Sequence, residues 1–325
     1  MASAEPPTGR IDVHVHFVPD FYRAALVAAG HAKPDGMAAI PDWDASAAIA
    51  FMDEMSIETS VLSISSPGIH FGDDAAARAL ARQVNEEGAR LRRDHPGRFG
   101  FFASVPLPDV DGAIAEAIHA LDVLKSDGIV LETNHHGRYL GDPDLEPFWH
   151  ALAARRTPVL IHPTSPACSC LERYPRPMLE FMFDTTRTVA DLVLAGVPGR
   201  YPEISFVVPH AGAALPVLAN RIDAFAMLAG GGAMRQPMTE ALRRFHFDLA
   251  GMPVPHLLRA LLDVADPARL HYGSDYPFTP VPACKMLAHA LESTPLLTDE
   301  LRGAIWRDNA LALFPNLAGR IPPAA

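Results

Sequence analysis

Strand-like and helix-like segments alternate eight times along this chain of 325 residues, and that alternation limits the folds it can adopt. Segments rich in β-branched and aromatic residues predict strands at residues 11–16, 60–65, 99–105, 128–132, 158–162, 204–209, 245–248 and 270–274. Amphipathic patterns, such as those over residues 73–93 and 179–194, predict helices between the strands. Eight such units in a chain of this length predict a (β/α)8 TIM barrel.

An open, doubly wound parallel sheet is the alternative fold for alternating strands and helices. That fold normally carries a glycine-rich phosphate-binding turn after its first strand, and no such turn follows residues 11–16. The glycines at positions 230–232 lie between two predicted helices, so they do not form one. We therefore expect one barrel domain over residues 1–325, in which the polar, proline-rich residues 1–9 are flexible.

Two long segments interrupt the regular alternation, and both follow predicted strands. Residues 17–43 come after the first strand, and residues 164–177 come after the fifth. In a TIM barrel, the segments that follow the strands gather at the C-terminal mouth, where active sites form. We expect these two insertions to shape access to a site at that mouth.

The composition excludes several classes of function. The net charge is −11 and the 27 basic residues form no stripe, which argues against a nucleic-acid partner. The three cysteines are too few for a disulfide framework and are typical of the reducing cytosol. The N-terminus lacks an apolar signal segment, and no apolar run is long enough to span a membrane. We therefore expect a cytoplasmic protein with no membrane partner.

Three of the predicted strands end in, or are followed by, residues that commonly bind metal ions. His14 and His16 lie two apart on the first strand, so both rings can face the barrel interior. His162 ends the fifth strand, and Asp275 follows the eighth. Because the ends of parallel strands converge at one mouth of a barrel, these residues predict a site for a divalent metal ion. Three imidazoles and one carboxylate suit Zn²⁺, Mn²⁺ or Fe²⁺.

Each of these residues also has an ordinary structural interpretation when it is taken alone. A single buried histidine is most often part of a core, and an aspartate such as Asp275 commonly caps a helix. His210, at the end of the sixth strand, can cap the next helix in the same way. The shared position of all these residues at strand ends favours a site over separate structural roles.

At these positions the chain resembles the amidohydrolase superfamily, and in particular its decarboxylase branch. That branch includes 6-methylsalicylate decarboxylase, γ-resorcylate decarboxylase and amino-carboxymuconate-semialdehyde decarboxylase. The resemblance covers residues 11–316, and its most specific motifs occupy residues 12–19, 97–103, 161–163, 209–212 and 273–278. The segments at 139–143 and 185–188 are similar to the methylsalicylate-type members.

The resemblance implies roles for individual residues. It implies that the metal ligands are His14, His16, His162 and Asp275. It also implies that His210 is catalytic, together with Asp275 in a second role. It also implies that the enzymes of this branch act as homodimers on small aromatic acids. No organic cofactor is expected for such a site.

The resemblance further suggests three substrate-binding residues. Arg221 falls where related enzymes bind the substrate carboxylate across a dimer interface, and an ordinary surface arginine is the alternative interpretation. Phe278 follows the Asp275 motif and is expected to stack on the substrate ring, or simply to line the site. Arg187 is expected to neutralise a carboxylate, with a structural ion pair as the simpler alternative.

Two departures from the superfamily pattern refine these expectations. The fourth strand lacks the lysine that bridges two metal ions in many related hydrolases, which favours a single ion. Glu132 at its end is an alternative bridging ligand, but a salt-bridged or solvated glutamate is the preferred interpretation. The muconate-type enzymes carry an arginine shortly before a Trp-Asp pair, and residues 38–42 before Trp43 and Asp44 contain none. Its absence favours a monocarboxylate aromatic acid.

The sequence therefore predicts a carboxy-lyase: a metal-dependent, non-oxidative decarboxylase of 6-methylsalicylate or a related hydroxybenzoate. Protonation of the ring carbon by Asp275, with His210 as its neighbour, avoids an aryl carbanion. The alternative enzyme is a metal-dependent hydrolase of a lactone, ester or amide, because the same metal, water and acid–base pair suit that reaction. A metal-binding barrel without activity is a third interpretation, which the presence of His210 disfavours.

Overall fold

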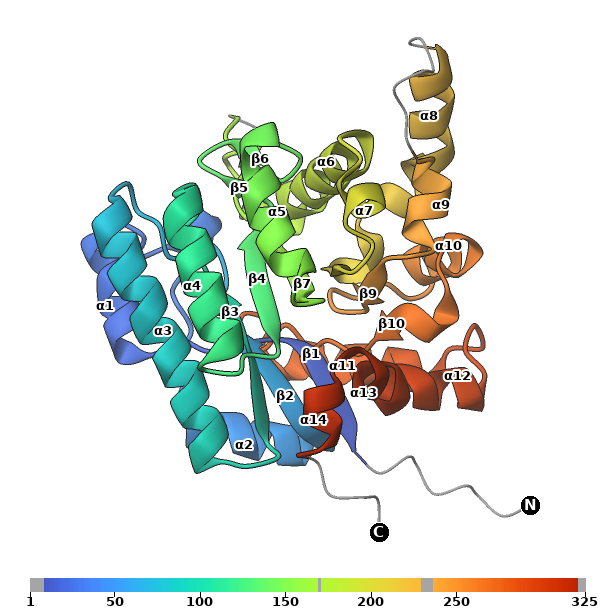
Figure 1. The fold of residues 1–325 in the computed structure, drawn as a ribbon. Coiled ribbons are helices and arrows are strands. Elements are labelled where there is room, and N and C mark those ends of the chain that lie inside the picture. The colour runs from blue at the N-terminus through green and yellow to red at the C-terminus, as the bar shows by residue number, and fades with distance from the viewer. Residues whose placement is uncertain (1–8, 169–170, 229–235, 321–325) are drawn as a thin grey trace.

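The computed structural model describes residues 9–168, 171–228 and 236–320 as a barrel of parallel strands with helices between them (Figure 1). In order around the barrel, the strands are β1 (Arg10–His16), β2 (Ile57–Ser63), β3 (Phe99–Ser104), β4 (Gly128–Glu132), β7 (Pro158–His162), β8 (Ser205–Val208), β9 (His246–Asp248) and β10 (Leu270–His271). Each neighbouring pair is parallel, as the predicted barrel requires. The expectations for residues 1–8 and 230–232 lie outside the described residues.

Backbone hydrogen bonds join the first and last strands, so the barrel is nearly closed. The Val13 N–H donates to the Tyr272 carbonyl (3.0 Å), and the Asp275 N–H donates to the His14 carbonyl (2.8 Å). The last ladder stops at His271, short of the predicted end at residue 274, because the chain then bonds to β1 instead of continuing along β9. This path brings Asp275 to the end of β1.

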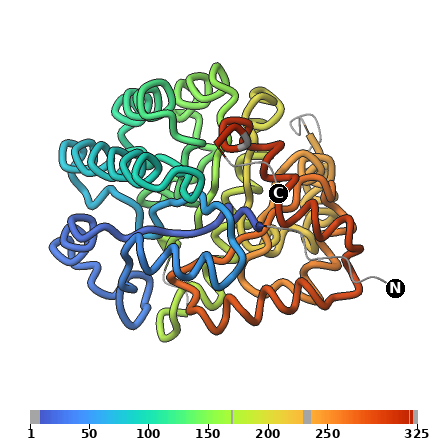
Figure 2. The backbone as a smooth tube through the Cα atoms, turned by 90° about the horizontal axis from the view of Figure 1, so that it is seen from below, coloured from blue at the N-terminus to red at the C-terminus, as the bar shows by residue number. Residues whose placement is uncertain are grey.

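Helices surround the strands, as the view from below shows (Figure 2). They are α1 (Asp20–Ala28), α2 (Ala45–Glu54), α3 (Asp74–Asp94), α4 (Val110–Asp122), α5 (Glu146–Ala153), α6 (Glu180–Leu194), α7 (Val197–Arg200), α8 (Leu215–Leu228), α9 (Met238–Leu242), α10 (His256–Val264), α11 (Val281–Ser293), α12 (Asp299–Gly303), α13 (Asn309–Leu313) and α14 (Pro315–Ala318). Asp44, Asp73 and Asp109 cap α2, α3 and α4 by accepting backbone N–H groups three residues on. In the part of the chain that the structure describes, the helices are too short or too polar to cross a bilayer.

Apolar side chains fill the lower barrel and leave its mouth for a site. Alternate residues of β1 to β8 face inward and pack together: Ile11, Val13, Val61, Phe102, Val130, Leu160 and Val207. Leu313, Phe314 and Leu317 near the C-terminus close the base of this cluster. The intervening residues face the helices and form the larger outer core. A barrel packed in this way is a core rather than a pore.

The two predicted insertions contact each other at the mouth. The first contains α1 and the short 3₁₀ helix η1 (Pro34–Gly36), which carries Asp35. The Ser165 hydroxyl of the second insertion donates to Asp35 Oδ1 (2.5 Å). A small hairpin of β5 (Asn134–His135) and β6 (Arg138–Tyr139) lies beside them, and Asn134 Nδ2 donates to the Ser165 carbonyl (3.1 Å). The insertions therefore form a bonded rim around the site.

Candidate active site

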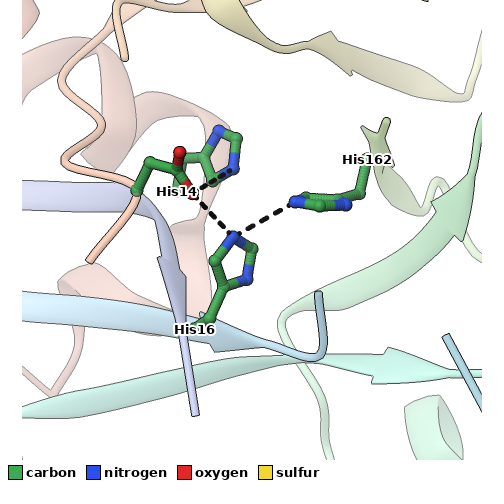
Figure 3. A group of neighbouring side chains, drawn as sticks. His14, His16 and His162 are labelled. Atoms are coloured by element: carbon green, nitrogen blue, oxygen red, sulfur yellow. Dashed lines mark hydrogen bonds and ion pairs between the residues drawn. The ribbon is translucent and has the colours of Figure 1, made fainter. Parts of the chain in front are cut away.

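Three imidazoles and one carboxylate converge at the C-terminal mouth of the barrel (Figure 3). His14 and His16 extend from the end of β1, and His162 ends β7. Asp275 follows β10, and one potential ligand atom from each residue lies within 4.8 Å of the others. Figure 3 shows the three labelled rings turned toward one another. The structure thus brings all four predicted ligands together.

The donor atoms of this cluster fit a divalent cation. His16 Nε2 lies 3.2 Å from His162 Nε2 and 3.1 Å from Asp275 Oδ1. His14 Nε2 is buried 3.7 Å from the same oxygen and has no hydrogen-bond partner among the described residues. Lone pairs on neutral imidazoles that face one another repel, and a shared cation removes that repulsion. Three nitrogens and one carboxylate oxygen suit zinc, manganese or iron.

An irregularity at the end of β1 positions the two histidines of that strand. Asp12 and Val15 of β1 pair with residues that are only two apart on β2, so β1 bulges between them. Asp12 Oδ1 accepts hydrogen bonds from the N–H groups of His14 and Ser274, each 3.1 Å long. Burial raises the pKa of Asp12 to about 7, although hydrogen bonds from Ser274 and His14 lower it. This link between β1 and the Asp275 segment was not predicted.

Asp248, at the end of β9, holds His14 from behind. His14 Nδ1 donates to Asp248 Oδ2 (2.9 Å), and both side chains are fully buried. Burial alone lowers the pKa of His14, but the charge and hydrogen bond of Asp248 outweigh it and raise that pKa to about 9. Burial raises the pKa of Asp248, yet the attraction of His14 holds it below its usual value. Asp248 is a functional residue that the sequence analysis missed.

The other two rings also have partners on their second nitrogens. His16 Nδ1 lies 3.0 Å from the Ser63 hydroxyl, and His162 Nδ1 lies 3.4 Å from Glu132 Oε2. Burial lowers the pKa of both His16 and His162. Glu132 is buried, so it is not solvated, and burial raises its pKa well above the usual value. Because burial disfavours the charged form of both Glu132 and His162, their contact is a hydrogen bond rather than the expected salt bridge. Glu132 contacts His162 at Nδ1, whereas Nε2 faces the other ligands, so Glu132 does not lie where a bridging ligand would and a single metal ion is favoured.

His210 faces the same cluster from the short turn η4 (His210–Gly212) after β8. Its N–H donates to Asp248 Oδ1 (3.0 Å), and its backbone has a φ of 53°. His210 Nε2 lies 3.8 Å from Asp275 Oδ2, the carboxylate oxygen that faces away from His16. A Cβ atom on Gly251 would lie 2.8 Å from the His210 ring, so the glycine allows this close packing. His210 therefore lies beside the four predicted metal ligands rather than capping a helix.

A cavity of about 280 Å³ adjoins the cluster. His162, His210 and Asp275 line one end, and Phe278 contacts His16 edge to face with ring centroids 5.6 Å apart. The apolar part of the lining comes from the two insertions, the residues that flank the second one, and α6, namely Met37, Pro163, Pro177, Met178, Phe181 and Met182. Among the described residues that line the cavity, none is arginine or lysine. Phe278 thus lies at the predicted place.

The two predicted substrate-binding arginines lie outside this cavity. Arg221 is exposed on α8 with its guanidinium 4.6 Å from the Phe225 ring centroid, and Figure 1 shows α8 projecting from the barrel. Arg187 is exposed on α6, and its Nη1 lies 3.8 Å from Asp184 Oδ1. This ion pair agrees with the structural alternative for Arg187. Arg221 does not line the cavity.

The chain belongs to the amidohydrolase family, whose pattern it matches over residues 11–315. It is 35% identical over 323 residues to a decarboxylase of Aspergillus niger, a match that covers 94% of this chain and 87% of that protein. It is 35% identical over 323 residues to the 6-methylsalicylic acid decarboxylase of Penicillium expansum, covering 97% and 99%. A crystal structure described as amidohydrolase II matches with a TM-score of 0.90 and 35% identity, over 94% of this chain and 100% of that one. The predicted family and barrel are confirmed.

Proposed function

We propose that this protein is a metal-dependent, non-oxidative decarboxylase of a salicylate-type aromatic acid. The observation that carries the proposal is the convergence of three imidazoles and the Asp275 carboxylate beside His210, at one end of a small cavity. The identity to 6-methylsalicylic acid decarboxylase, over nearly the full length of both proteins, supports 6-methylsalicylate or a close relative as substrate. We expect one zinc or manganese ion, no organic cofactor, one domain over residues 1–325 and a cytoplasmic location.

The reaction requires a proton at the ring carbon that bears the carboxylate, because direct loss of CO2 leaves an aryl carbanion. When bound, the metal ion supplies positive charge that holds the substrate carboxylate and an ortho phenolate. Burial raises the pKa of Asp275, but the hydrogen bond with His16, the nearby His210 and the charge of the imidazoles hold it well below its usual value. Asp275 is therefore a carboxylate at rest, so it can act as the predicted proton donor to the ring carbon only after it takes up a proton, which the neighbouring His210 can supply. Cleavage of the C–C bond then releases CO2 and restores the aromatic ring.

The shape and lining of the cavity support a single-ring substrate with an apolar substituent. Its volume of about 280 Å³ holds one substituted benzene ring rather than a larger ligand. Met178, Phe181 and Met182 offer apolar contact to a ring and to a methyl group. A second charged substituent has no cationic partner among the described lining residues, which agrees with a monocarboxylate.

We further propose a homodimer in which Arg221 of the partner subunit reaches the substrate carboxylate. The face of α8 that carries Arg221 also exposes Val217, Phe225 and Leu228, which are 68%, 56% and 80% exposed. An exposed apolar face of this kind is typical of a protein–protein interface. The lack of a cationic side chain among the described lining residues supports a contribution from a second chain.

The proposal is tested by incubating metal-replete enzyme in air with 6-methylsalicylate while CO2 and m-cresol are measured. We expect equal amounts of both products, and we expect both to be lost after metal chelation and in the His210→Ala variant. His289→Ala, which replaces an exposed histidine on α11, is the matched control and should keep its turnover. Hydrolysis of a lactone or aryl ester, without CO2 from any hydroxybenzoate, would place the protein among the hydrolases instead.

A further inference from the structure

One side of the barrel interior is polar, although the rest of the lower barrel is apolar. β9 and β10 direct His246, Asp248 and His271 inward, and all three side chains are buried. The strand register places them there, because His246 pairs with the inward-facing Val207 and His271 pairs with Asp248. Burying polar groups costs free energy unless they are hydrogen-bonded, so this side of the barrel needs an explanation beyond packing.

Arg269, His246, His271 and Asp248 form a column of polar side chains from the base of the barrel to the ligand group at its mouth. At the base, Arg269 Nη1 donates to His246 Nε2 (2.9 Å). His246 Nδ1 and His271 Nε2 are 2.9 Å apart, and the ring planes are tilted by 29° with their centroids 5.1 Å apart. At the top, His14 Nδ1 donates to Asp248 Oδ2 (2.9 Å). Between them, His271 Nδ1 is buried without a partner among the described residues, beside Asp248 in the ladder.

Arg269 determines where the protons of this column lie, because a guanidinium can only donate hydrogen bonds. His246 Nε2 must accept, so the proton of neutral His246 lies on Nδ1 and is donated to His271 Nε2. The proton of neutral His271 then lies on Nδ1, which has no partner among the described residues, while Asp248 is the ladder neighbour of His271. Both rings are neutral at pH 7, since burial lowers the pKa of His246 to about 2 and that of His271 to about 3.

We propose that Arg269, His246 and His271 are positioning residues for the metal centre. They direct an N–H dipole at Asp248, which stabilises its charge and holds His14 with its Nε2 lone pair toward the metal ion. The same carboxylate accepts the N–H of His210 (3.0 Å), so the column supports the catalytic turn as well. This inference rests on the metal site of the proposed function and does not depend on the decarboxylation itself.

The lower end of the column opens to the outside of the barrel, which makes it accessible to substitution. Arg269 and His246 line a cavity of about 880 Å³ at the base of the barrel, and Arg269 is only half-buried. At the upper end, His14 and Asp248 are fully buried. Arg269→Met therefore removes the fixed donor while it leaves the packed interior in place.

Nitrogen-15 NMR of the metal-free protein, labelled at histidine, tests the proton positions directly. We expect His246 and His271 to carry their protons on Nδ1, with no change between pH 8 and pH 5. His246→Gln and His271→Gln assign the two sets of resonances. In Arg269→Met, His246 should show a mixture of the two tautomers, because its Nε2 no longer has an obligatory donor. Wild-type His271 with its proton on Nε2 would overturn the proposal.

Metal affinity tests what the column does. His271→Phe keeps a ring but removes both nitrogens, and we expect it to weaken Mn²⁺ binding about tenfold. His271→Asn, whose amide can accept from His246 and donate toward Asp248, should recover the affinity to within about threefold. Val207→Ala is the matched control, since it disturbs the same layer of the barrel and should lower thermal stability without weakening Mn²⁺ binding.

Equal Mn²⁺ dissociation constants for wild-type protein and His271→Phe would contradict the proposed role. So would an equal loss of affinity in Val207→Ala, because it would trace the effect to general destabilisation. Neither NMR nor metal binding measures CO2 release. A negative result in the decarboxylase assay therefore does not decide whether these residues position the metal centre. Negative NMR or metal-binding results likewise do not decide whether the protein is a decarboxylase.

Discussion

Two groups of buried histidines lie in the same barrel, and their nitrogen atoms point in different ways. At the mouth, His14, His16 and His162 turn one nitrogen each toward a common point, with two of these atoms 3.2 Å apart. Lower in the barrel, His246 Nδ1 and His271 Nε2 point at each other and lie 2.9 Å apart. Closeness of imidazoles alone therefore does not identify a metal site, whereas the direction of their lone pairs does.

The two groups of histidines also differ in the charge of their neighbours. The mouth group has the Asp275 carboxylate among its rings and Asp248 behind His14. The lower pair has the guanidinium of Arg269 at its outer end. A carboxylate attracts a divalent cation and a guanidinium repels it, so only the mouth group is built to bind one. The lower pair is suited to support that site from below.

The largest difference between the mouth group and the lower pair is expected when Asp275 of the mouth group is replaced with asparagine. This change removes the anionic ligand and one half of the proton-transfer pair, so kcat should fall by at least about 10³-fold. Elemental analysis should also show less than one metal ion per chain. His246→Gln, a change in the lower pair, should keep full metal content when metal is in excess. Normal metal content and turnover in Asp275→Asn would remove the distinction between the two groups.

The second contrast lies within the mouth group, where His14 alone should make metal affinity depend on pH. The pKa of His14 is raised to about 9 in the metal-free protein, so a metal ion must displace its proton at any pH below 9. His16 and His162 have lowered pKa values and are already neutral at pH 7. The dissociation constant should therefore fall about 50-fold from pH 7 to pH 9, about tenfold up to pH 8 and about fivefold beyond it as the pH reaches the pKa. Competition with a metal-sensitive dye measures this slope, and a flat profile would contradict the role of His14.

The same proton links the stability of the metal-free protein to pH. The folded pKa of His14 lies above its value of 6.5 in an unfolded chain, so protonated His14 stabilises the fold. This contribution is complete below pH 6.5 and is lost as the pH rises through about 9. The Tm of metal-free protein should fall across that window, and the decrease should be absent when saturating metal has displaced the proton.

The third contrast concerns the carboxylates that support the histidines. Asp248→Asn keeps the shape of the side chain but removes the charge behind His14, so metal affinity should fall about 10–100-fold. It should also flatten the pH dependence, because the pKa of His14 then returns toward neutrality. Asp184→Asn is the control, since Asp184 is equally buried but bonds to Thr133, Asn134 and Tyr139 instead. A loss of metal affinity in both variants would show that burial, not position, is responsible.

The smallest effect is expected at the apolar wall of the cavity. Met182→Gln places an amide where a methyl substituent is expected to lie, and KM for 6-methylsalicylate should rise several-fold, about 3–10-fold. Met182→Leu keeps the apolar surface and should change KM by less than about twofold. The ratio of KM values between the two variants is the measurement. Equal values would place the substrate methyl group elsewhere in the cavity.

The barrel and its four predicted ligands could be recognised from the sequence because both depend on local patterns. The spacing of His14 and His16 puts them on one strand, and the barrel topology then brings His162 and Asp275 to the same mouth. The support from Asp248 depends on a contact between side chains of β1 and β9, which are not neighbours in the sheet, and no local pattern records such a contact. A carboxylate at the last position of the seventh predicted strand was the available sign of its role.

The substrate-binding arginines were harder to place for a related reason. The neighbours of Arg187 depend on how α6 packs, and its carboxylate partner, Asp184, is only three residues away on the same helix. Arg221 contacts Phe225 on its own helix, and its proposed contact with a substrate involves a second chain, about which one sequence says little. The column of Arg269, His246 and His271 depends on strand register and on the direction of hydrogen bonds, and both require three-dimensional contacts.

The measurement that tests the central claim most directly is a metal titration of chelator-stripped enzyme, with CO2 release from 6-methylsalicylate recorded at each step. One ion at the mouth cluster predicts that stripped enzyme is inactive, and that CO2 release rises linearly and stops rising at one equivalent of Mn²⁺ or Zn²⁺ per chain. Undiminished CO2 release from stripped enzyme, or a rise that continues to two equivalents, would contradict a single metal ion held by His14, His16, His162 and Asp275.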